Sequence, residues 1–473
     1  MLYEALFKHA LFPAYETLIK RRASVRYMRE CQRNQWLNPA QLQHLQLQRL
    51  NDLLAHCWVQ VPFLKTYWSD HGLRPGALRD VQELARYPVL TKAQITEHYQ
   101  DMVAANWRDR TMTKQTGGST GAAFTFEYTM ESYTRRVAAM WRGYGWAGAS
   151  LGARTAYLWG TGMRESGWGA VKDRLYHGAF ARRFFDVTKL TEVNIDARID
   201  DLARYKPDAI VGYVAPLAVI ARRMLETGRQ IPPVRGVISA AEALYEPERQ
   251  VIEQAFRTKA FNTYGSREVM LMAAECDHHQ GLHVTADQLM LETVDEQGQP
   301  VAAGESGQVA ITDLFNHGMP LVRYLNGDCA TYARHACSCG RGLPLLSSVD
   351  GRLLDIIRTP DGRVLPGEMF VTMSMQWPMV LKYQVVQTQP DTLQFRLVLK
   401  RCWQAGEHAH WMAQMRKAVG PALTIETAEV DDIPVNATGK RRITVSCDNL
   451  TQVGPLPEGT IVRSDPGSGH RHA

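Results

Sequence analysis

Residues 114–123 read Lys-Gln-Thr-Gly-Gly-Ser-Thr-Gly-Ala-Ala, and the alternating segment Phe124-Thr-Phe-Glu-Tyr128 follows at once. The part from Thr116 to Gly121 contains glycines, hydroxyl residues and no bulky side chain. Such a segment can wrap backbone N–H and hydroxyl donors around phosphate oxygens. It lacks the Gly-Lys-Ser/Thr ending of the P-loop motif, so a nucleotide would have to be held by a different fold. Taken alone, the segment also suits an ordinary loop between strands.

The composition is that of a folded globular protein. A chain of 473 residues is long enough for two or three domains. The net charge of +6 is modest, and basic and acidic residues are interleaved, so we expect no nucleic-acid partner. No apolar stretch approaches the length of a membrane span, and we expect no signal peptide. Eight sparse cysteines favour a reducing, cytoplasmic location, where clustered cysteines indicate a metal or catalysis.

The middle of the chain alternates between strand and helix patterns. We expect a helix from Met130 to Trp146 and short strands at 154–159, 208–213 and 234–239, each strand followed by a helical pattern. This alternation is typical of a mostly parallel sheet covered by helices, with ligands at the carboxyl ends of the strands. We expect Ser239-Ala-Ala-Glu242 and the loop at Thr116 to lie at such ends.

The predicted fold class is α/β, with a large N-terminal domain of mostly parallel, helix-covered sheets plus a small antiparallel subdomain, and a small α+β C-terminal lid domain. Residues 1–110 form the helical part of the large domain, and residues 111–355 form the rest of it, which the family resemblance described next implies to be its nucleotide- and acid-binding part. Residues 356–447 form a C-terminal domain, which the same resemblance implies to be mobile. The polar, Gly/Pro-rich tail 448–473 is predicted to be disordered.

Several segments, read in order, resemble the adenylate-forming superfamily of acyl-CoA synthetases and nonribosomal-peptide adenylation domains, in particular its phenylacetate-CoA ligase and CapK-like branch. Residues 116–121 match its phosphate loop, and Tyr264-Gly-Ser-Arg-Glu268 matches its adenine and magnesium motif. Residues 319–328 match the segment that ends in a ribose-binding Asp. Gly351-Arg352 matches the hinge, and Gly439-Lys440 matches the mobile catalytic lysine. Here Gly121 is followed by Ala122 where the family often has Gly-Lys-Pro, so the loop brings no cation of its own.

The resemblance implies a two-step reaction. A carboxylate attacks the α-phosphate of ATP, pyrophosphate leaves, and a nucleophile then takes the acyl group. It implies Lys440 and Glu268 as catalytic residues, with Glu268 also binding Mg²⁺. The implied nucleotide-binding residues are Thr116, Gly117, Gly118, Ser119, Thr120, Gly121, Glu242, Tyr264, Gly265, Ser266, Asp328 and Arg352.

A second group of residues indicates a metal. Cys276, His283, Cys337 and Cys339 would give a Cys3His set of the kind that closes a structural Zn²⁺ site. This spacing also resembles a pattern found in part of the phenylacetate-CoA ligase-like branch. His278, His279 or His335 could replace His283. The alternative is that these cysteines are unrelated, since Cys-x-Cys lacks the usual two-residue gap.

We therefore expect an ATP-dependent ligase that uses ATP and Mg²⁺, with a structural Zn²⁺. The sequence does not identify the carboxylic acid. The acceptor is coenzyme A, a carrier protein or an amine. The protein could form a homodimer. Trp159, Tyr213 and Trp168 could line an aryl pocket, although aromatic residues at strand ends are more often core. The alternatives are an amide-forming ligase of polysaccharide or secondary-metabolite biosynthesis and a catalytically silent nucleotide-binding scaffold.

Overall fold

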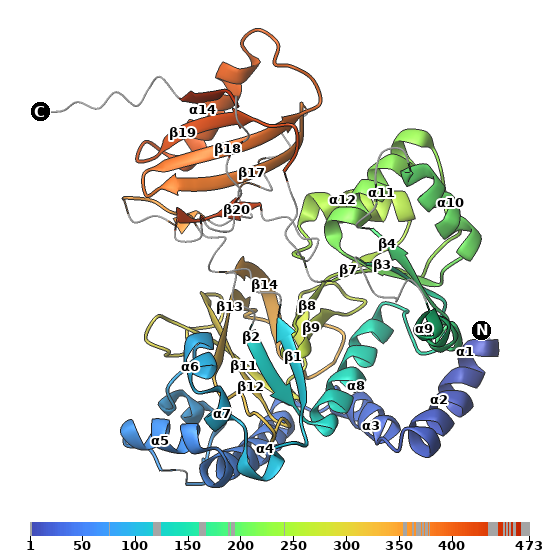
Figure 1. The fold of residues 1–473 in the computed structure, drawn as a ribbon, viewed down its shortest axis with the longest axis vertical. Coiled ribbons are helices and arrows are strands. Elements are labelled where there is room, and N and C mark those ends of the chain that lie inside the picture. The colour runs from blue at the N-terminus through green and yellow to red at the C-terminus, as the bar shows by residue number, and fades with distance from the viewer. Residues whose placement is uncertain are drawn as a thin grey trace, which may run out of the picture. The chain divides into compact units, whose positions relative to one another are not determined.

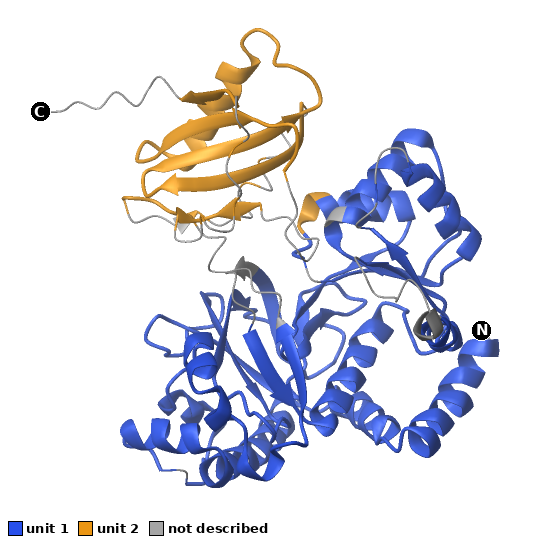
Figure 2. Ribbon diagram, in the orientation of Figure 1, with its two compact units in different colours: residues 1–116, 124–244, 248–349 blue, residues 117–123, 245–247, 350–473 orange. Residues whose placement is uncertain are grey.

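The computed structural model contains two compact units, drawn in blue and orange in Figure 2. The first consists of residues 1–116, 124–244 and 248–349, and the second chiefly of residues 350–473. The described residues are 2–74, 76–116, 124–159, 167–187, 190, 194–240, 242–352, 357–361, 364–365, 370, 373, 377, 379–433, 443–447, 450, 453, 456 and 460–464.

A five-stranded parallel sheet with the strand order β4-β3-β5-β6-β7 forms one part of the first unit (Figure 1). Its strands are β3 (Thr155–Trp159), β4 (Arg182–Asp186), β5 (Ala209–Gly212), β6 (Gly236–Ser239) and β7 (Ala260–Phe261). The helices α9 (Gly167–Ala179), α10 (Ile195–Tyr205), α11 (Val214–Thr227) and α12 (Glu246–Phe256) alternate with them. All residues of β5 and β6 are buried, as expected when helices cover both faces of a parallel sheet. The predicted alternation is confirmed.

A seven-stranded antiparallel sheet forms the second part, in the order β11-β12-β13-β14-β10-β9-β8. Its strands are β8 (Thr263–Ser266), β9 (Met270–Glu275), β10 (Leu282–Val284), β11 (Leu289–Val294), β12 (Ser306–Asp313), β13 (Tyr324–Tyr332) and β14 (Leu345–Arg352). Helix α8 (Met130–Trp146) packs against β9 and has the predicted bounds. Its Arg142, which is 1% exposed, pairs with the fully buried Asp287 at 2.8 Å and so fixes the helix on the sheet.

The predicted phosphate loop joins the strands of a separate antiparallel hairpin, β1 (Met112–Thr116) and β2 (Phe124–Tyr128). The expectation that this loop follows a strand of the parallel sheet is therefore wrong. The inward side chains of β2, Phe124, Phe126 and Tyr128, are buried in a core with Trp68 and Tyr324. The parallel sheet has a different core. The alternating pattern of β2 is therefore that of a hairpin strand buried on one face, and not that of a strand covered by helices on both faces.

Helices precede the hairpin. They are α3 (Ser24–Asn34), α4 (Pro39–Gln60), α5 (Pro62–Asp70), α6 (Lys92–Glu97) and α7 (Tyr99–Met102), with a helical segment at Leu2–Ile19 and 3₁₀ turns at Val81–Arg86 and Ala105–Trp107. Thr91 caps α6 through a capping box with Gln94. In the described part of the chain, no helix combines the length and apolar character that crossing a membrane requires.

The described part of the second unit contains a five-stranded sheet in the order β20-β17-β18-β19-β21 and the helix α14. Its elements are β17 (Val380–Gln389), β18 (Thr392–Leu399), α14 (Glu407–Val419), β19 (Thr424–Glu429), β20 (Thr444–Val445) and β21 (Val462–Ser464), and β15 (Ile357–Arg358) pairs with β16 (Val364–Leu365). Trp377, Phe395 and Trp411 pack at its centre. Residues 462–464, which were predicted to be part of a disordered tail, instead form β21, because their backbone pairs with the edge of β19.

Candidate active site

The carboxyl edge of the parallel sheet leads directly into the antiparallel sheet. Ser239, at the end of β6, donates through Oγ to Asn262 Oδ1 at 3.2 Å, and Thr263 Oγ1 donates to the Ser239 carbonyl. Asn262 N–H in turn donates to Glu275 Oε2 at 2.7 Å. These bonds fix the start of β8, which carries Tyr264, relative to the strand end where the sequence predicts a ligand.

Tyr264, Asn326 and Asp328 form a hydrogen-bonded group. The Tyr264 hydroxyl donates to Asp328 Oδ2 at 2.8 Å, and Asn326 Nδ2 donates to the Tyr264 hydroxyl at 2.9 Å and to Asp328 Oδ2 at 2.7 Å. Strands β8 and β13 are separated by three strands in the hydrogen-bonded order. The sheet therefore curves strongly enough to bring two of the predicted nucleotide-binding residues together.

A bulge in β13 presents Asp328. Strands β12 and β13 are in register at Gln308 and Cys329 and again at Ala310 and Leu325, so one residue of β12 lies opposite three of β13. Gly327 supplies the left-handed backbone, with φ of +84°. The Asn326 Oδ1 accepts from Asp328 N–H at 3.0 Å and stabilises the bulge. The carboxylate is thereby lifted out of the ladder, as is typical of bulges near binding sites.

Glu268 lies in the turn between β8 and β9 and is 8% exposed. Its Oε1 accepts from the Tyr324 hydroxyl at 3.3 Å. The Tyr324 ring stacks on Phe124, with the ring centroids 5.7 Å apart. Phe124 is the first residue after the predicted phosphate loop, so the structure places the base of that loop beside the partner of Glu268.

The close approach of β8 and β9 explains why residue 265 is glycine. A Cβ at this position would lie 2.3 Å from the Met270 carbonyl oxygen, so the close strand approach requires glycine. The neighbouring Ser266 Oγ is buried and has no hydrogen-bond partner among the described residues. The motif Tyr264–Glu268 is thus a tight hairpin that holds a buried hydroxyl, Ser266, and a buried carboxylate, Glu268, which accepts from Tyr324.

Lys114 of β1 lies near two other basic residues. The Lys114 ammonium lies 5.1 Å from the Tyr128 ring centroid and 5.4 Å from that of Tyr133. Partial burial, followed by the positive charges of Arg136 and Arg267, lowers the pKa of Lys114. Arg136 is already paired with Asp313, and Tyr128 pairs with Met112 at the end of the hairpin away from residues 117–123, so these charges do not lie beside the predicted loop.

An aromatic pair lies at the carboxyl ends of β3 and β5. The rings of Trp159 and Tyr213 stack, with centroids 4.3 Å apart. Burial, and after it the negative charge of Glu242, raises the pKa of Tyr213, so Glu242 lies close to this pair. The side chain of Trp168 lies outside the described residues.

Part of the predicted site also lies outside the described residues, namely Gly117, Gly118, Ser119, Thr120, Gly121 and Lys440. Thr116 ends β1 and Arg352 ends β14, but the side chains of both are likewise outside the described set. Sequence reasoning missed Tyr324 and Asn326, although both lie in the segment 319–328 that it singled out. A polar residue two positions before Asp328, next to a glycine, was the available signal for Asn326.

The four predicted zinc ligands converge. One donor atom from each of Cys276, His283, Cys337 and Cys339 lies within 4.8 Å of the others. The Sγ atoms of Cys276 and Cys337 are 3.7 Å apart, and His283 Nε2 lies 3.3 Å from Cys339 Sγ. A tetrahedral site with Zn–S distances of about 2.3 Å has S···S edges of about 3.8 Å, so the donor set fits zinc.

The surroundings prepare these side chains for a cation. His283 is fully buried and its Nδ1 lies 3.2 Å from the Leu343 carbonyl oxygen, to which an Nδ1–H would donate, leaving Nε2 free toward the sulfurs. Burial lowers the pKa of His283 to about 4, so its ring is neutral at pH 7. Burial raises the pKa of the Cys276 thiol to about 12, so its thiolate requires a cation.

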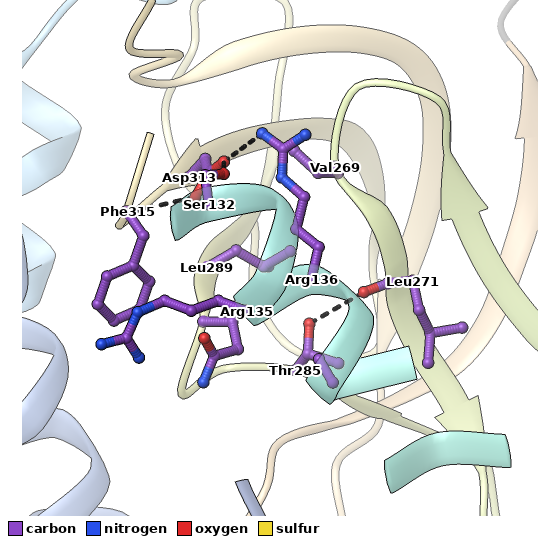
Figure 3. Close-up of a pocket in the computed structure, with 11 residues that line it drawn as sticks. Ser132, Arg135, Arg136, Val269, Leu271, Thr285, Leu289, Asp313 and Phe315 are labelled. Atoms are coloured by element: carbon purple, nitrogen blue, oxygen red, sulfur yellow. Dashed lines mark hydrogen bonds and ion pairs between the residues drawn. The ribbon is translucent and has the colours of Figure 1, made fainter. Parts of the chain in front are cut away.

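A small pocket lies between α8 and the antiparallel sheet (Figure 3). Arg136 Nη2 donates to Asp313 Oδ2 at 2.5 Å, and Ser132 Oγ donates to the same oxygen at 3.0 Å. Thr285 and Leu271 line the other side. None of the predicted nucleotide or metal residues lines this pocket, so it is separate from both groups.

Comparisons with known proteins agree with the geometry. Residues 357–447 match the family described as the CapK C-terminal domain. The phenylacetate-coenzyme A ligase of Thermus thermophilus is 25% identical over 360 residues, which is 74% of this chain and 79% of that protein. The phenylacetate-coenzyme A ligase of Escherichia coli is 25% identical over 337 residues, covering 70% of this chain and 75% of that protein.

Solved structures are similar as well. The 2-hydroxyisobutyryl-CoA ligase in the postadenylation state, in complex with R3-HIB-AMP, matches with a TM-score of 0.72 at 18% identity, covering 89% of this chain and 93% of that chain. The same ligase in complex with 2-HIB-AMP and CoA in the thioesterification state gives a TM-score of 0.59 at 19% identity, covering 89% and 92%. The chain therefore has the fold of the adenylate-forming ligases and is similar in sequence to phenylacetate-coenzyme A ligases, with a C-terminal part that matches the CapK C-terminal domain.

Proposed function

We propose that this protein is an ATP-dependent ligase that activates a carboxylic acid as its acyl adenylate and transfers the acyl group to the thiol of coenzyme A. The observation that carries the proposal is the hydrogen-bonded group of Tyr264, Asn326 and Asp328 on this fold. The named relatives are coenzyme A ligases, and they are similar to this chain over most of its length.

Asp328 would hold the ribose. A carboxylate raised on a bulge can accept hydrogen bonds from two neighbouring hydroxyls, and the bonds from Tyr264 and Asn326 fix its orientation. The Tyr264 ring would lie against the adenine. Binding energy at these residues would position the α-phosphate for attack without taking part in the chemical step.

Charge neutralisation would come from several residues. Glu268 would help to hold Mg²⁺, which when bound neutralises phosphate charge. The loop 116–121 would donate hydrogen bonds to phosphate oxygens. Lys440 would bring an ammonium to the charge that develops on the α-phosphate. Glu242, Gly265, Ser266 and Arg352 would complete the nucleotide site.

We assign a structural zinc to Cys276, His283, Cys337 and Cys339. Four protein ligands close a tetrahedron, so no position remains for substrate or an activated water. The ion would hold the end of β9, strand β10 and the connection between β13 and β14 together.

The acceptor has a second candidate. Residues 357–447 match the CapK C-terminal domain, whose description names no acceptor, so an amine in place of the thiol is kept as the second candidate. Both acceptors share the first half-reaction. A carrier-protein thiol would use the same chemistry as coenzyme A.

The test is acid-dependent pyrophosphate release. The protein is incubated with ATP, Mg²⁺ and a panel of carboxylic acids, with coenzyme A, an amine or no acceptor, and the acyl product is identified by mass spectrometry. Glu268→Gln should suppress release, whereas the exposed turn variant Glu305→Gln should not. Nucleotide binding without pyrophosphate release for any acid would identify a silent scaffold and refute the proposal.

A further inference from the structure

The first residues of the chain form one continuous helix from Leu2 to Ile19. The segments α1 (Leu2–Leu6), η1 (Phe7–Leu11), α2 (Phe12–Ala14) and η2 (Tyr15–Ile19) follow one another without a break, because the residues at their junctions all have right-handed helical backbone angles. The helix has wide turns over much of its length. A repeat of four residues therefore stays close to one side of the helix.

One side of this helix is anchored to the protein. Phe7 and Phe12 are each 4% exposed and pack with Trp141 and Phe180. Glu16 is buried on the same side and accepts from Ser24 Oγ at 2.5 Å. These contacts fix how the helix is rotated about its axis.

The opposite side is an apolar stripe that no described residue covers. Leu2, Leu6, Ala10, Ala14 and Leu18 recur every four residues, and all are exposed. Leu2 is 90% exposed, Leu18 is 75% exposed and the adjacent Ile19 is 70% exposed. Single exposed apolar residues are ordinary, but a continuous row of them indicates a binding surface.

Helix α9 extends this surface. The Tyr3 hydroxyl donates to the Ala179 carbonyl, and Tyr15 and Tyr176 lie with ring centroids 6.3 Å apart, so the two helices are neighbours (Figure 1). On α9, Val171 and Leu175 are four residues apart, and Leu175 is 71% exposed. Two neighbouring helices thus both present large apolar side chains to the surroundings.

The exposed charges near the stripe are mostly positive. Lys20 and Arg21 are exposed at the end of the helix, and Lys172 and Arg174 are exposed on α9, which also carries the partly exposed Asp173; Lys8 is exposed but is four residues from Phe12, on the anchored side. The carboxylates of the helix are held within the protein. Glu4 pairs with Arg235 at 2.9 Å, and Glu16 is buried against Ser24. Apolar residues accompanied by lysines and arginines, with the acids of the helix turned inward, complement a negatively charged lipid surface.

We propose that the helix Leu2–Ile19, with the outer face of α9, binds the surface of an anionic lipid bilayer. The apolar stripe enters the boundary between headgroups and acyl chains, and the lysines and arginines pair with lipid phosphates. The protein then lies on the membrane and does not cross it. This inference is independent of the proposed ligase activity.

The test is cosedimentation of the full-length protein with vesicles. It should sediment with vesicles of phosphatidylglycerol and phosphatidylcholine and not with phosphatidylcholine alone. Raising the salt from about 0.1 M to about 1 M should release most of it, since the screening length falls from about 10 Å to about 3 Å. Leu18→Glu should weaken binding by about tenfold or more, because it replaces an inserting leucine with a repelled charge.

Matched variants separate the surface from general effects. Val59 is 71% exposed on α4, so Val59→Glu introduces the same charge outside the stripe and should bind as the unmodified protein does. Lys20→Glu should weaken binding by more than the fivefold expected for one lost charge near the surface, whereas Lys65→Glu on α5 should not. None of the four substitutions should change the melting temperature.

Three results would overturn the proposal. One is the absence of sedimentation with anionic vesicles at low salt. A second is equal loss of binding in Leu18→Glu and Val59→Glu. The third is a dimer in solution that Leu18→Glu dissociates and that does not bind vesicles, which would make the stripe an interface between two copies of the chain.

Discussion

Removing the Tyr264 hydroxyl should weaken ATP binding while leaving the adenine-binding ring in place. In Tyr264→Phe, Asp328 loses the hydrogen bond of 2.8 Å, and Asn326 loses one of its acceptors. A net contribution of about 1–1.4 kcal/mol corresponds to a five- to tenfold increase in the KM for ATP. The measurement is the ATP dependence of pyrophosphate release at saturating acid, and kcat should change little because the lost contact positions the ribose.

The matched control is Tyr332→Phe. Tyr332 lies on the same strand as Asp328 and donates to the Leu291 carbonyl at 2.6 Å, so this variant also loses a tyrosine hydrogen bond. It should lower the free energy of unfolding by about 1 kcal/mol and leave the KM for ATP unchanged. If the two variants raise this KM equally, or if Tyr264→Phe leaves it unchanged, Tyr264 has no role in orienting Asp328 for the nucleotide.

Three further changes test other parts of the protein. Asp328→Ala should raise the KM for ATP by more than Tyr264→Phe does, with little change in the melting temperature of the unliganded protein. Lys440→Ala should slow adenylate formation by about a hundredfold, as expected for the loss of about 3 kcal/mol of transition-state stabilisation, and pyrophosphate exchange measures it. Cys337→Ser should lower both the zinc content, measured by metal analysis, and the melting temperature, with activity falling only as folded protein is lost.

Each of these has a result that contradicts it. If Asp328→Ala binds ATP normally, Asp328 has only a structural role. Asp295→Ala, which removes another turn carboxylate in the same sheet, is the control. Unchanged exchange in folded Lys440→Ala would remove the lysine from the site. If a chelator stopped catalysis at once without changing the melting temperature, the metal would be catalytic and not structural.

Much of the fold could be predicted because its signals are local. The helix at Met130–Trp146 and the strands β3, β5 and β6 of the parallel sheet follow from apolar patterns within a few residues of each other, whereas β4 was not predicted. The hairpin around the phosphate loop was misplaced, because its alternating strand packs on residues such as Trp68 and Tyr324 that are remote in the sequence. Strand β21 was missed for the same reason, since backbone pairing with β19 decides it.

Part of the candidate site could also be predicted from the sequence, and part could not. The four predicted zinc ligands could be picked out because cysteine is rare and its clustering with histidine is visible in the sequence, and the structure brings their donor atoms together. The bond between Tyr264 and Asp328 joins residues 64 positions apart on strands that do not pair. Only the curvature of the sheet creates it, and no local pattern encodes that curvature.

The proposed zinc site would close a long stretch of chain. Cys276 and Cys337 are 61 positions apart, and strands β10, β11, β12 and β13 lie between them. On the ribosome, the cluster can form only after Cys339 has emerged, by which time Asp328 and its bulge have already been synthesised. A cell short of zinc would therefore make fewer molecules in which this loop is closed, while each completed molecule would work at its full rate. A shortage of zinc would therefore lower the amount of folded protein and leave the turnover rate of each folded molecule unchanged.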